Sequence, residues 1–327
     1  MHILIAPDSF KGTFTASRVA SLIAEGARAY GADVTELPVA DGGEGTYEIL
    51  SSSLGAKEVW MDTLGPWREP LRACYGLAPN GTAVIGLAAA SGITAPSSGE
   101  RSAVTADTYG TGLLMAHAAG SGARRILVAA GGSATTDGGS GAITAIEDRG
   151  GLRGAAVTVL SDVTTAFEDA ARVFGPQKGA TPAEVDQLTA RLHAQASDHP
   201  RDPRGVPRTG AAGGFSGGMW SMYGAALVPG AEFVLDLVDF DRSAAKADAI
   251  VVGEGRLDSQ TGQGKIISEI LARSTGKPVY AVVGSTHPDL GDYARNFADV
   301  IVASDAAALQ EAGHRVASQV AALGMRS

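Results

Sequence analysis

The sequence predicts an α/β protein whose strands are mostly parallel. Short apolar segments typical of buried strands alternate with longer segments in which apolar residues recur at helical spacing. The composition agrees, because 45% of the residues are hydrophobic, only 6% are aromatic, and 44 glycines are available for tight strand-to-helix turns. A chain of 327 residues exceeds one ordinary hydrophobic core, so we expect two domains.

The first forty residues contain a β-α-β unit, which implies parallel strands and a right-handed connection. Residues 2–6 (HILIA) are a short apolar strand, and residues 34–39 (VTELPV) form the next one. Between them, apolar residues from Val19 to Tyr30 recur at helical spacing, and Gly31 follows as a helix terminator.

Similar elements continue along the rest of the chain. A helix over residues 176–196 is predicted to start with a capping box, with Thr181 as the N-cap and Glu184 as its partner. Further strand-like segments are residues 82–92, 124–132, 155–162, 247–255, 277–285 and 298–304. Because both ends of the chain carry β-α-β signals, we expect a discontinuous domain of residues 1–66 plus 245–327 and an inserted domain of residues 67–244.

Charge and cysteine content exclude several classes of protein. The net charge is −9, and no basic run is longer than Arg124-Arg125, which argues against nucleic-acid or anionic-membrane partners. Cys74 is the only cysteine and is expected to be a small buried residue, so no disulfide can form within the chain. No apolar stretch reaches the length of a membrane span, and no signal peptide is recognisable, so a cytoplasmic location is expected.

Polar residues follow nearly every predicted strand. Ligands of parallel α/β sheets bind beyond the carboxyl ends of the strands, so these residues are candidates for one site. The segment GGSATTDGG (131–139) combines glycines, which let backbone N–H groups approach a ligand, with hydroxyl donors and a following helix. This combination suits an anion, most naturally phosphate. A tight turn with a capping Ser or Thr is the alternative.

The segment GEGRLDSQTGQGK (253–265) is unusually charged for a connection between a strand and a helix. Lys265 is predicted in the first helical turn, where a cation opposes the helix dipole and needs an anionic partner. Glu254, Arg256 and Asp258 suit the binding of phosphate or metal, although a surface ion-pair network would use the same residues.

Asp162 follows the predicted strand over 155–160, with Ser161 between them. A carboxylate at that end of a strand can accept the proton of a substrate hydroxyl. The alternative is that Asp162 caps a helix that begins near Val163.

Established nucleotide fingerprints are missing. The segment TGQGKII lacks the spacing and the hydroxyl of a P-loop, no G-x-G-x-x-G follows a strand with an acidic residue about twenty positions on, and protein-kinase motifs are absent. A dehydrogenase of small hydroxy acids that uses NAD remains an alternative reading of the α/β pattern, as does a binding protein for an anionic sugar acid.

Several motifs together resemble the bacterial glycerate kinase family, of the glycerate 2-kinase type found in glucarate and glyoxylate pathways. The matching segments are APDSFKGT, PVADGGEGT, AAASG, GTGLLMAHA, GGSATTDGG, SDVTT, FGPQKGA, GAAGG and GEGRLDSQT-GQGK, in family order. The resemblance implies ATP-dependent phosphorylation of D-glycerate to 2-phosphoglycerate with Mg²⁺. It also implies two α/β domains, one of them discontinuous and flavodoxin-like, with the active site in the cleft between them.

The resemblance also implies roles for individual residues. The catalytic residues are Asp162 as the base, Lys178 as a cation for the transition state, and Arg256. The substrate-binding residues are Asp8, Ser9, Lys11, Asp41, Glu44 and Gly255. The ATP-binding residues are Gly131, Gly132, Ser133, Thr135, Asp137 and Lys265, and the Mg²⁺ ligands are Asp41, Asp137 and Glu254. Glycerate and ATP are the expected partners of a monomer or homodimer.

Three departures from the family pattern concern the site. The segment 145–160 is shorter than usual, which leaves open a related sugar acid as substrate. Residues 165–167 are TAF in place of Asn-Pro-Leu, close to the proposed base, and GAAGG continues as FSGGMWSMYGA.

Overall fold

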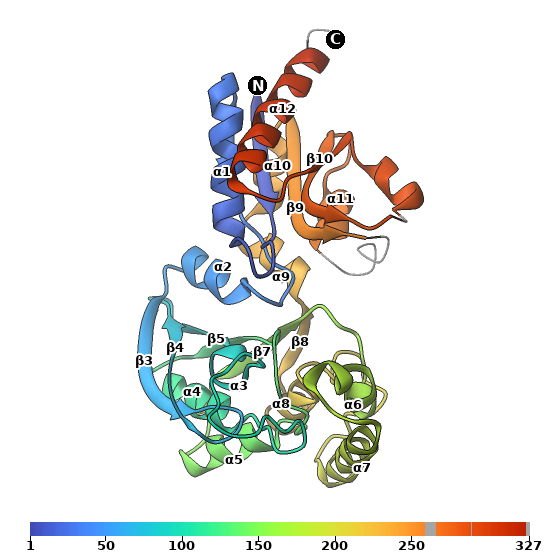
Figure 1. Cartoon of the computed structure of the whole chain (residues 1–327). Coiled ribbons are helices and arrows are strands. Elements are labelled where there is room, and N and C mark those ends of the chain that lie inside the picture. The colour runs from blue at the N-terminus through green and yellow to red at the C-terminus, as the bar shows by residue number, and fades with distance from the viewer. Residues whose placement is uncertain (259–265, 289, 325–327) are drawn as a thin grey trace. The chain divides into compact units, whose positions relative to one another are not determined.

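The computed structural model describes residues 1–258, 266–288 and 290–324, and the chain divides into two compact units (Figure 1). The terminal unit combines residues 1–49 with residues 231–327, and the central unit is residues 50–230. These boundaries lie earlier in the chain than residues 66 and 245. The reason is that β3 (Lys57–Leu64) belongs to the sheet of the central unit, whereas α10 (Phe240–Lys246) contacts β1 of the terminal unit.

The terminal unit contains a five-stranded sheet in the order β11-β10-β9-β1-β2, and every pair in it is parallel. In chain order this arrangement is 2-1-3-4-5, the flavodoxin-like order, so the predicted fold of the discontinuous domain is confirmed. The strands are β1 (His2–Pro7), β2 (Asp33–Glu36), β9 (Ala249–Leu257), β10 (Val279–Thr286) and β11 (Asp299–Val302).

Helices α1 (Ala16–Tyr30) and α12 (Ala306–Gly324) pack against each other and against one face of this sheet. The two backbones approach closely at Gly26, where a Cβ atom would lie 1.7 Å from the carbonyl oxygen of Gln310. Alternate strand residues face the other side, where α10 contacts β1 and α11 (Ile266–Arg273) contacts β9. The sheet is therefore covered on both faces, as its continuous apolar strands require.

The central unit contains a six-stranded sheet in the order β3-β4-β5-β6-β7-β8. Strands β5 to β8 are parallel, and an antiparallel β3–β4 hairpin, which the sequence did not predict, is added at one edge. The remaining strands are β4 (Pro70–Leu77), β5 (Thr82–Gly86), β6 (Arg125–Ala129), β7 (Ala156–Ser161) and β8 (Ala226–Pro229).

Helix caps follow the sequence closely in both units. The Thr15 side chain accepts from the N–H of Arg18 at the start of α1, and Gly31 ends that helix in a left-handed conformation. Thr181 and Glu184 form the predicted capping box of α7 (Pro182–Asp198). The other helices are α2 (Thr46–Ser53), α3 (Ala88–Ser91), α4 (Tyr109–Gly120), α5 (Ser140–Asp148), α6 (Ala170–Phe174), α8 (Phe215–Tyr223), α9 (Gly230–Leu237) and the 3₁₀ turns Phe167–Asp169, Pro176–Lys178 and Gly291–Asn296.

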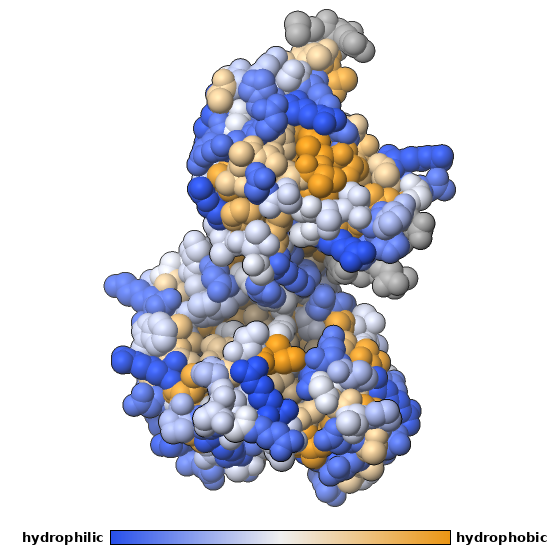
Figure 2. All heavy atoms as spheres, in the orientation of Figure 1, coloured by the Kyte–Doolittle hydropathy of each residue, from blue (hydrophilic) through white to orange (hydrophobic). Residues whose placement is uncertain are grey.

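Hydrophobic residues on the face drawn in Figure 2 occur in small groups among hydrophilic ones. Among the residues that the structure describes, no helix combines the length and the apolar character needed to cross a bilayer. Cys74 lies on the strand β4 and is half-buried.

Candidate functional site

The terminal unit gathers carboxylates at the carboxyl ends of three adjacent strands. Asp8 directly follows β1, Asp41 follows the segment after β2, and Glu254 lies near the end of β9. The N–H of Asp8 donates to the carbonyl oxygen of Gly253 (2.8 Å), which holds the residue against β9. Asp8 and Asp41 are both more than nine-tenths buried. We call these three residues the carboxylate cluster.

Burial and like charge act together on Asp8. Desolvation is the main cause that raises its pKa to about 8, and the charges of Asp41 and Glu254 raise it further. A hydrogen bond from the N–H of Ser9 (2.6 Å) and the nearby ammonium of Lys11 oppose this shift. At neutral pH the Asp8 carboxyl is therefore largely protonated and can donate a hydrogen bond.

A tight turn over residues 10–14 presents Lys11 to solvent. The N–H of Phe10 donates to the carbonyl oxygen of Phe14 (2.8 Å), and the N–H of Phe14 donates back (3.0 Å). The turn lies over Gly255 of β9, where a Cβ atom would be 3.4 Å from the backbone of Phe10 and of Lys11. The absence of a side chain at Gly255 thus lets the backbone of the turn lie close to β9.

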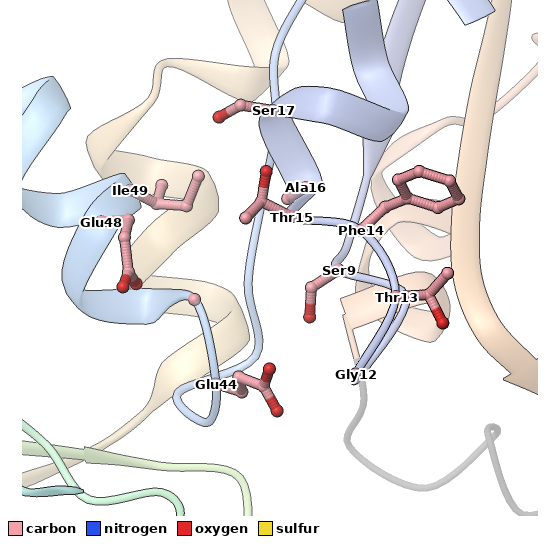
Figure 3. A pocket seen from close by; sticks show the side chains of 11 residues that line it. Ser9, Gly12, Thr13, Phe14, Thr15, Ala16, Ser17, Glu44, Glu48 and Ile49 are labelled. Atoms are coloured by element: carbon pink, nitrogen blue, oxygen red, sulfur yellow. The ribbon is translucent and has the colours of Figure 1, made fainter. Parts of the chain in front are cut away.

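A pocket of about 260 Å³ lies between this turn, the start of α1 and the segment that carries Glu44 (Figure 3). The hydroxyl of Ser9 is directed into this space in Figure 3, and its oxygen is buried and has no hydrogen-bond partner among the residues that the structure describes. Glu44 and Glu48 are exposed at the other side of the pocket. The pocket therefore offers both donors and carboxylate acceptors to a small polar molecule.

The central unit builds a second polar cluster on residues 131–139, which we call the glycine loop. The loop follows β6, and Ser133 forms an isolated bridge with Gly92, which comes just after α3 and β5. Asp162 follows β7, the next strand in the sheet. The carboxyl ends of parallel strands lie at one edge of a sheet, so these segments share that edge.

Lys178 reaches the glycine loop from the turn after α6. Its ammonium donates to the hydroxyl of Ser133 (2.9 Å) and to the carbonyl oxygen of Thr135 (2.5 Å). Burial lowers the pKa of Lys178 to about 8, against the opposing charge of Asp137. The ammonium is thus a desolvated cation fixed on the loop, and a desolvated cation interacts strongly with a phosphoryl group.

The carboxylate of Asp137 accepts hydrogen bonds from other groups of the chain. One oxygen accepts from the N–H and the hydroxyl of Thr108 (2.9 and 2.7 Å) and from the N–H of Gly141 (3.0 Å), and the other accepts from the N–H of Gly139 (3.2 Å). These bonds join the first turns of α4 and α5 to the loop. They favour a structural role for Asp137 over direct contact with ATP or Mg²⁺.

Side chains of helix α7 donate hydrogen bonds to the backbone of the glycine loop. Arg191 donates to the carbonyl oxygens of Val104 (2.8 Å) and Thr136 (2.6 Å), and Gln195 donates to that of Asp137 (3.1 Å). The hydroxyls of Thr135 and Thr136 are fully buried and have no partner among the described residues. The loop therefore retains hydrogen-bonding capacity that its supports do not use. The sequence analysis missed this support, because helical spacing does not show which exposed-looking residues of α7 face the loop.

Asp162 is half-buried and does not cap a helix, since the next helical turn starts only at Phe167. The hydroxyl of the preceding Ser161 accepts from the N–H of Val163 (3.2 Å), which fixes the turn after β7. Arg208 donates to the carbonyl oxygen of Ser161 (2.9 Å) and has a left-handed backbone (φ 71°). The sequence analysis did not single out Arg208, although the Pro-, Gly- and Arg-rich composition of residues 199–214 was a signal for it.

The remaining predicted site residues are placed as follows. Arg256 is exposed on β9 opposite Ser285 of β10, and Gly131 and Gly132 begin the glycine loop. Lys265 lies outside the described residues.

The carboxylate cluster is chemically suited to Mg²⁺, because Mg²⁺ prefers oxygen ligands. A divalent cation would also offset the charges of Asp41 and Glu254, which add to desolvation in raising the pKa of Asp8. Over residues 1–258, 266–288 and 290–324, no three His, Cys, Asp or Glu side chains are grouped so that they could hold a metal by themselves. An ion in this place would be held by one or two carboxylates, with phosphate and water as its other ligands.

The fold and the two clusters define the class of protein. It is an α/β protein with polar side chains at the carboxyl ends of parallel strands, the arrangement by which such sheets bind small ligands.

Comparisons with known proteins identify the family. The profile of the Glycerate kinase family matches residues 3–149 and 148–326. A glycerate kinase of Bacillus subtilis (strain 168) is 37% identical, over 88% of this chain and 86% of its own length. A glycerate 2-kinase of Escherichia coli (strain K12) is 34% identical, over 89% and 87%. A crystal structure from Salmonella typhimurium LT2, assigned as a glycerate kinase 2, has a TM-score of 0.85 and 31% identity and covers both chains fully. The chain belongs to the glycerate kinase family.

Proposed function

We propose that this protein transfers the γ-phosphoryl group of ATP to the 2-hydroxyl of D-glycerate and releases 2-phosphoglycerate and ADP. Membership of the family and the name of the Escherichia coli relative support this reaction. The structural observation that carries the proposal is the desolvated ammonium of Lys178, fixed on the glycine loop at the edge where Asp162 lies. Two hydroxyls of the loop, on Thr135 and Thr136, have no partner in the described part of the chain. We expect a cytoplasmic enzyme, as a monomer or a homodimer, that binds only small molecules.

The reaction breaks the bond between the γ-phosphorus and its bridging oxygen to ADP and forms a bond to the glycerate oxygen. Asp162 accepts the hydroxyl proton, late in a loose transition state. Lys178 and Arg256 offset the charge on the moving phosphoryl group. The nucleotide would be held by the backbone of Gly131 and Gly132, by Ser133 and Thr135, and by Lys265. Asp137 would contribute indirectly, because its hydrogen bonds fix the conformation of the loop.

The terminal unit would hold the hydroxy acid. Asp8, Ser9 and Lys11 provide donors for its carboxylate and hydroxyls, and Asp41 and Glu44 provide acceptors. Gly255 contributes indirectly, because it lets the turn that carries Lys11 approach β9. Asp41 and Glu254 would also hold Mg²⁺, whereas the carboxylate of Asp137 is taken up by Thr108, Gly139 and Gly141. The ion, when bound, would neutralise phosphate charge.

A screen for released ADP tests the reaction. The full-length protein is incubated with ATP, Mg²⁺ and one hydroxy acid at a time, and phosphorus NMR then locates the phosphate in the product. D-Glycerate should give the highest kcat/KM and a 2-phosphate. Preference for a longer sugar acid would change the substrate, and reduction of NAD without ADP release would replace the kinase by a dehydrogenase. Binding without turnover would indicate a binding protein.

The first test of the mechanism is Asp162→Asn, which removes the base but keeps the size of the side chain. We expect kcat to fall by about 10²–10⁴-fold while the KM for glycerate changes little. Asp169→Asn, on the short helical turn that follows, is the matched control and should keep normal kinetics. Turnover near normal in Asp162→Asn would remove this residue from the mechanism.

A further inference from the structure

A second pocket lies in the central unit, at the C-terminal ends of α4 and α5 and beside the edge strand β3. Its volume is about 400 Å³. Met61, Leu113 and Ala116 form the apolar part of its wall, and the side chains of Arg149 and Arg153 line its polar part. None of the residues proposed for glycerate kinase chemistry lines this pocket.

The two arginines of the pocket are alike with respect to the partners of their guanidinium groups. In the part of the chain that the structure describes, neither the Arg149 nor the Arg153 guanidinium donates a hydrogen bond or forms an ion pair. Both side chains are exposed. Two neighbouring unpaired guanidinium groups repel each other, and each presents a planar set of donors that matches carboxylate and phosphate.

The backbone at Arg153 is unusual for an arginine. The N–H of Ala155 donates to the carbonyl oxygen of Leu152 (2.9 Å), so Arg153 and Gly154 are the central residues of a turn, with φ of 51° and 81°. Turns of this geometry favour Asn or Gly at both positions. An arginine here adopts a strained conformation that glycine would adopt freely, which points to a use for its side chain.

The turn directs this side chain over the end of α4. A Cβ atom built on Gly120 would lie 3.8 Å from the Cζ and 3.9 Å from the Nη2 of Arg153. Interaction with the helix dipole accounts for a cation directly after α5, where Arg149 lies. The helix dipole does not account for a left-handed backbone at Arg153, because an arginine can reach a helix end from an unstrained position.

Three further polar side chains complete or support the wall. The hydroxyl of Tyr75 is hydrogen-bonded to Nδ1 of His117 (3.0 Å) and to the hydroxyl of Ser121 (3.2 Å), and this fixes the two side chains that line the pocket. Asp62 is the one acidic group in the lining and is exposed. An anionic group facing the arginines and a hydroxyl group facing Asp62 would satisfy the charges on both sides.

We propose that this pocket binds a small organic anion that carries a phosphate or carboxylate group and a hydroxyl group. Arg149 and Arg153 bind the anionic group, and Asp62 accepts a hydrogen bond from the hydroxyl. The site is separate from the glycine loop, which lies at the N-terminal ends of the same two helices.

Calorimetric titration with glycerol 3-phosphate tests the site on the full-length protein. The wild type should bind with a dissociation constant of about 1 mM or tighter. Arg149→Gln/Arg153→Gln should weaken this binding at least about tenfold, or lower the stoichiometry by one if the probe also binds elsewhere. Arg172→Gln/Arg242→Gln, which removes two exposed charges at other places, should bind like the wild type. Asp62→Asn should weaken glycerol 3-phosphate more than inorganic phosphate.

Gly120→Asp provides an independent variant, because its carboxylate would lie beside the Arg153 guanidinium and compete with the anion. It should also weaken binding, and equal thermal unfolding midpoints would show that the variants are folded. No saturable binding to the wild type, or an unchanged isotherm for Arg149→Gln/Arg153→Gln, would overturn the proposal. Glycerate phosphorylation without added anion should be normal in that double variant, so failure of the kinase reaction leaves this test intact.

Discussion

The ammonium of Lys178 is the positioned charge that best suits phosphoryl transfer. Its ammonium is fixed by Ser133 and Thr135, so a change at this position removes a positioned charge. We expect Lys178→Gln to lower kcat by about 10²–10³-fold, with a smaller effect on the KM for glycerate. The neighbouring exposed residue provides the control, and Gln177→Ala should be close to the wild type in both constants.

The pH profile provides a second readout for the same residue. Because burial lowers the pKa of Lys178 to about 8, the ammonium loses its proton as the pH rises through that value in the free enzyme. We therefore expect kcat/KM to fall above about pH 8, and Lys178→Arg to extend the alkaline limb if it retains activity. An alkaline limb that is the same in Lys178→Arg would show that another group titrates there.

The raised pKa of Asp8 predicts how the free energy of unfolding depends on pH. Its carboxyl has a pKa of about 8 in the folded protein and an ordinary value of 3.8, so the folded state holds an extra proton between these pH values. The free energy of unfolding should fall as the pH rises through this window, by up to about 1.4 kcal/mol per pH unit, and level off above about 8. Asp8→Asn cannot ionise and should lose this part of the pH dependence.

Urea unfolding at pH 5 and pH 8 measures the effect. Asp8→Asn should gain stability relative to the wild type on going from pH 5 to pH 8, whereas Asp33→Asn, at an exposed position on β2, should follow the wild type. Parallel pH dependence in Asp8→Asn and the wild type would show that Asp8 is ionised in the folded protein.

At the scale of elements, the segment GAAGG acts by packing its backbone against the glycine loop. The carbonyl oxygen of Gly213 accepts from the N–H of Gly138 (3.0 Å), and a Cβ atom on Gly213 would lie 1.9 Å from the carbonyl oxygen of Thr135. That carbonyl also binds Lys178. The motif thus determines the position of the loop without a side chain of its own.

Two alanine substitutions separate this contact from backbone strain. Gly205 and Gly213 both have left-handed backbones (φ 68° and 65°), but a Cβ atom on Gly205 would meet nothing within 4 Å. Gly205→Ala should cost about 1–2 kcal/mol of stability and leave kcat unchanged. Gly213→Ala should cost a further 1–3 kcal/mol or so and lower kcat sharply, because Thr135 must move. Equal effects in the two variants, by thermal unfolding and kinetics, would contradict this account.

At the scale of the whole molecule, the two units differ in how the chain forms them. The central unit is one continuous segment, whose sheet and cores are complete within residues 50–230. The terminal unit needs both ends of the chain, since β1 and β2 pair in one sheet with β9, β10 and β11. The central unit can therefore form from one fragment of the chain, whereas the terminal unit needs two.

We predict that a fragment of residues 46–230, which begins at α2, folds by itself with a cooperative urea transition and has no glycerate kinase activity. A fragment of residues 1–49 should stay unfolded, because it holds only β1, β2 and α1 of the terminal unit. Circular dichroism distinguishes the outcomes, and an unfolded 46–230 fragment would show that the central unit requires the terminal unit for stability.

The sequence by itself determined the elements and the candidate residues. Apolar runs and helical spacing located β1, α1 and the capping box of α7, because these signals are local and act through a few neighbouring residues. Polar residues after the strands likewise identified Asp8, Asp162 and the glycine loop. Some observed strands are shorter than the expected ones, as with β5 at residues 82–86, because the apolar residues that follow belong to the short helix α3.

Only the tertiary structure decided which partners the polar residues contact. It assigned the carboxylate of Asp137 to Thr108 and the starts of two helices, brought Lys178 onto Thr135, and placed Arg191 behind the loop. Hydrogen bonds between residues distant in the chain determine these roles, and local spacing carries no information about such partners. The same holds for the desolvation of Asp8, whose carboxyl is protonated because of the strands packed around it.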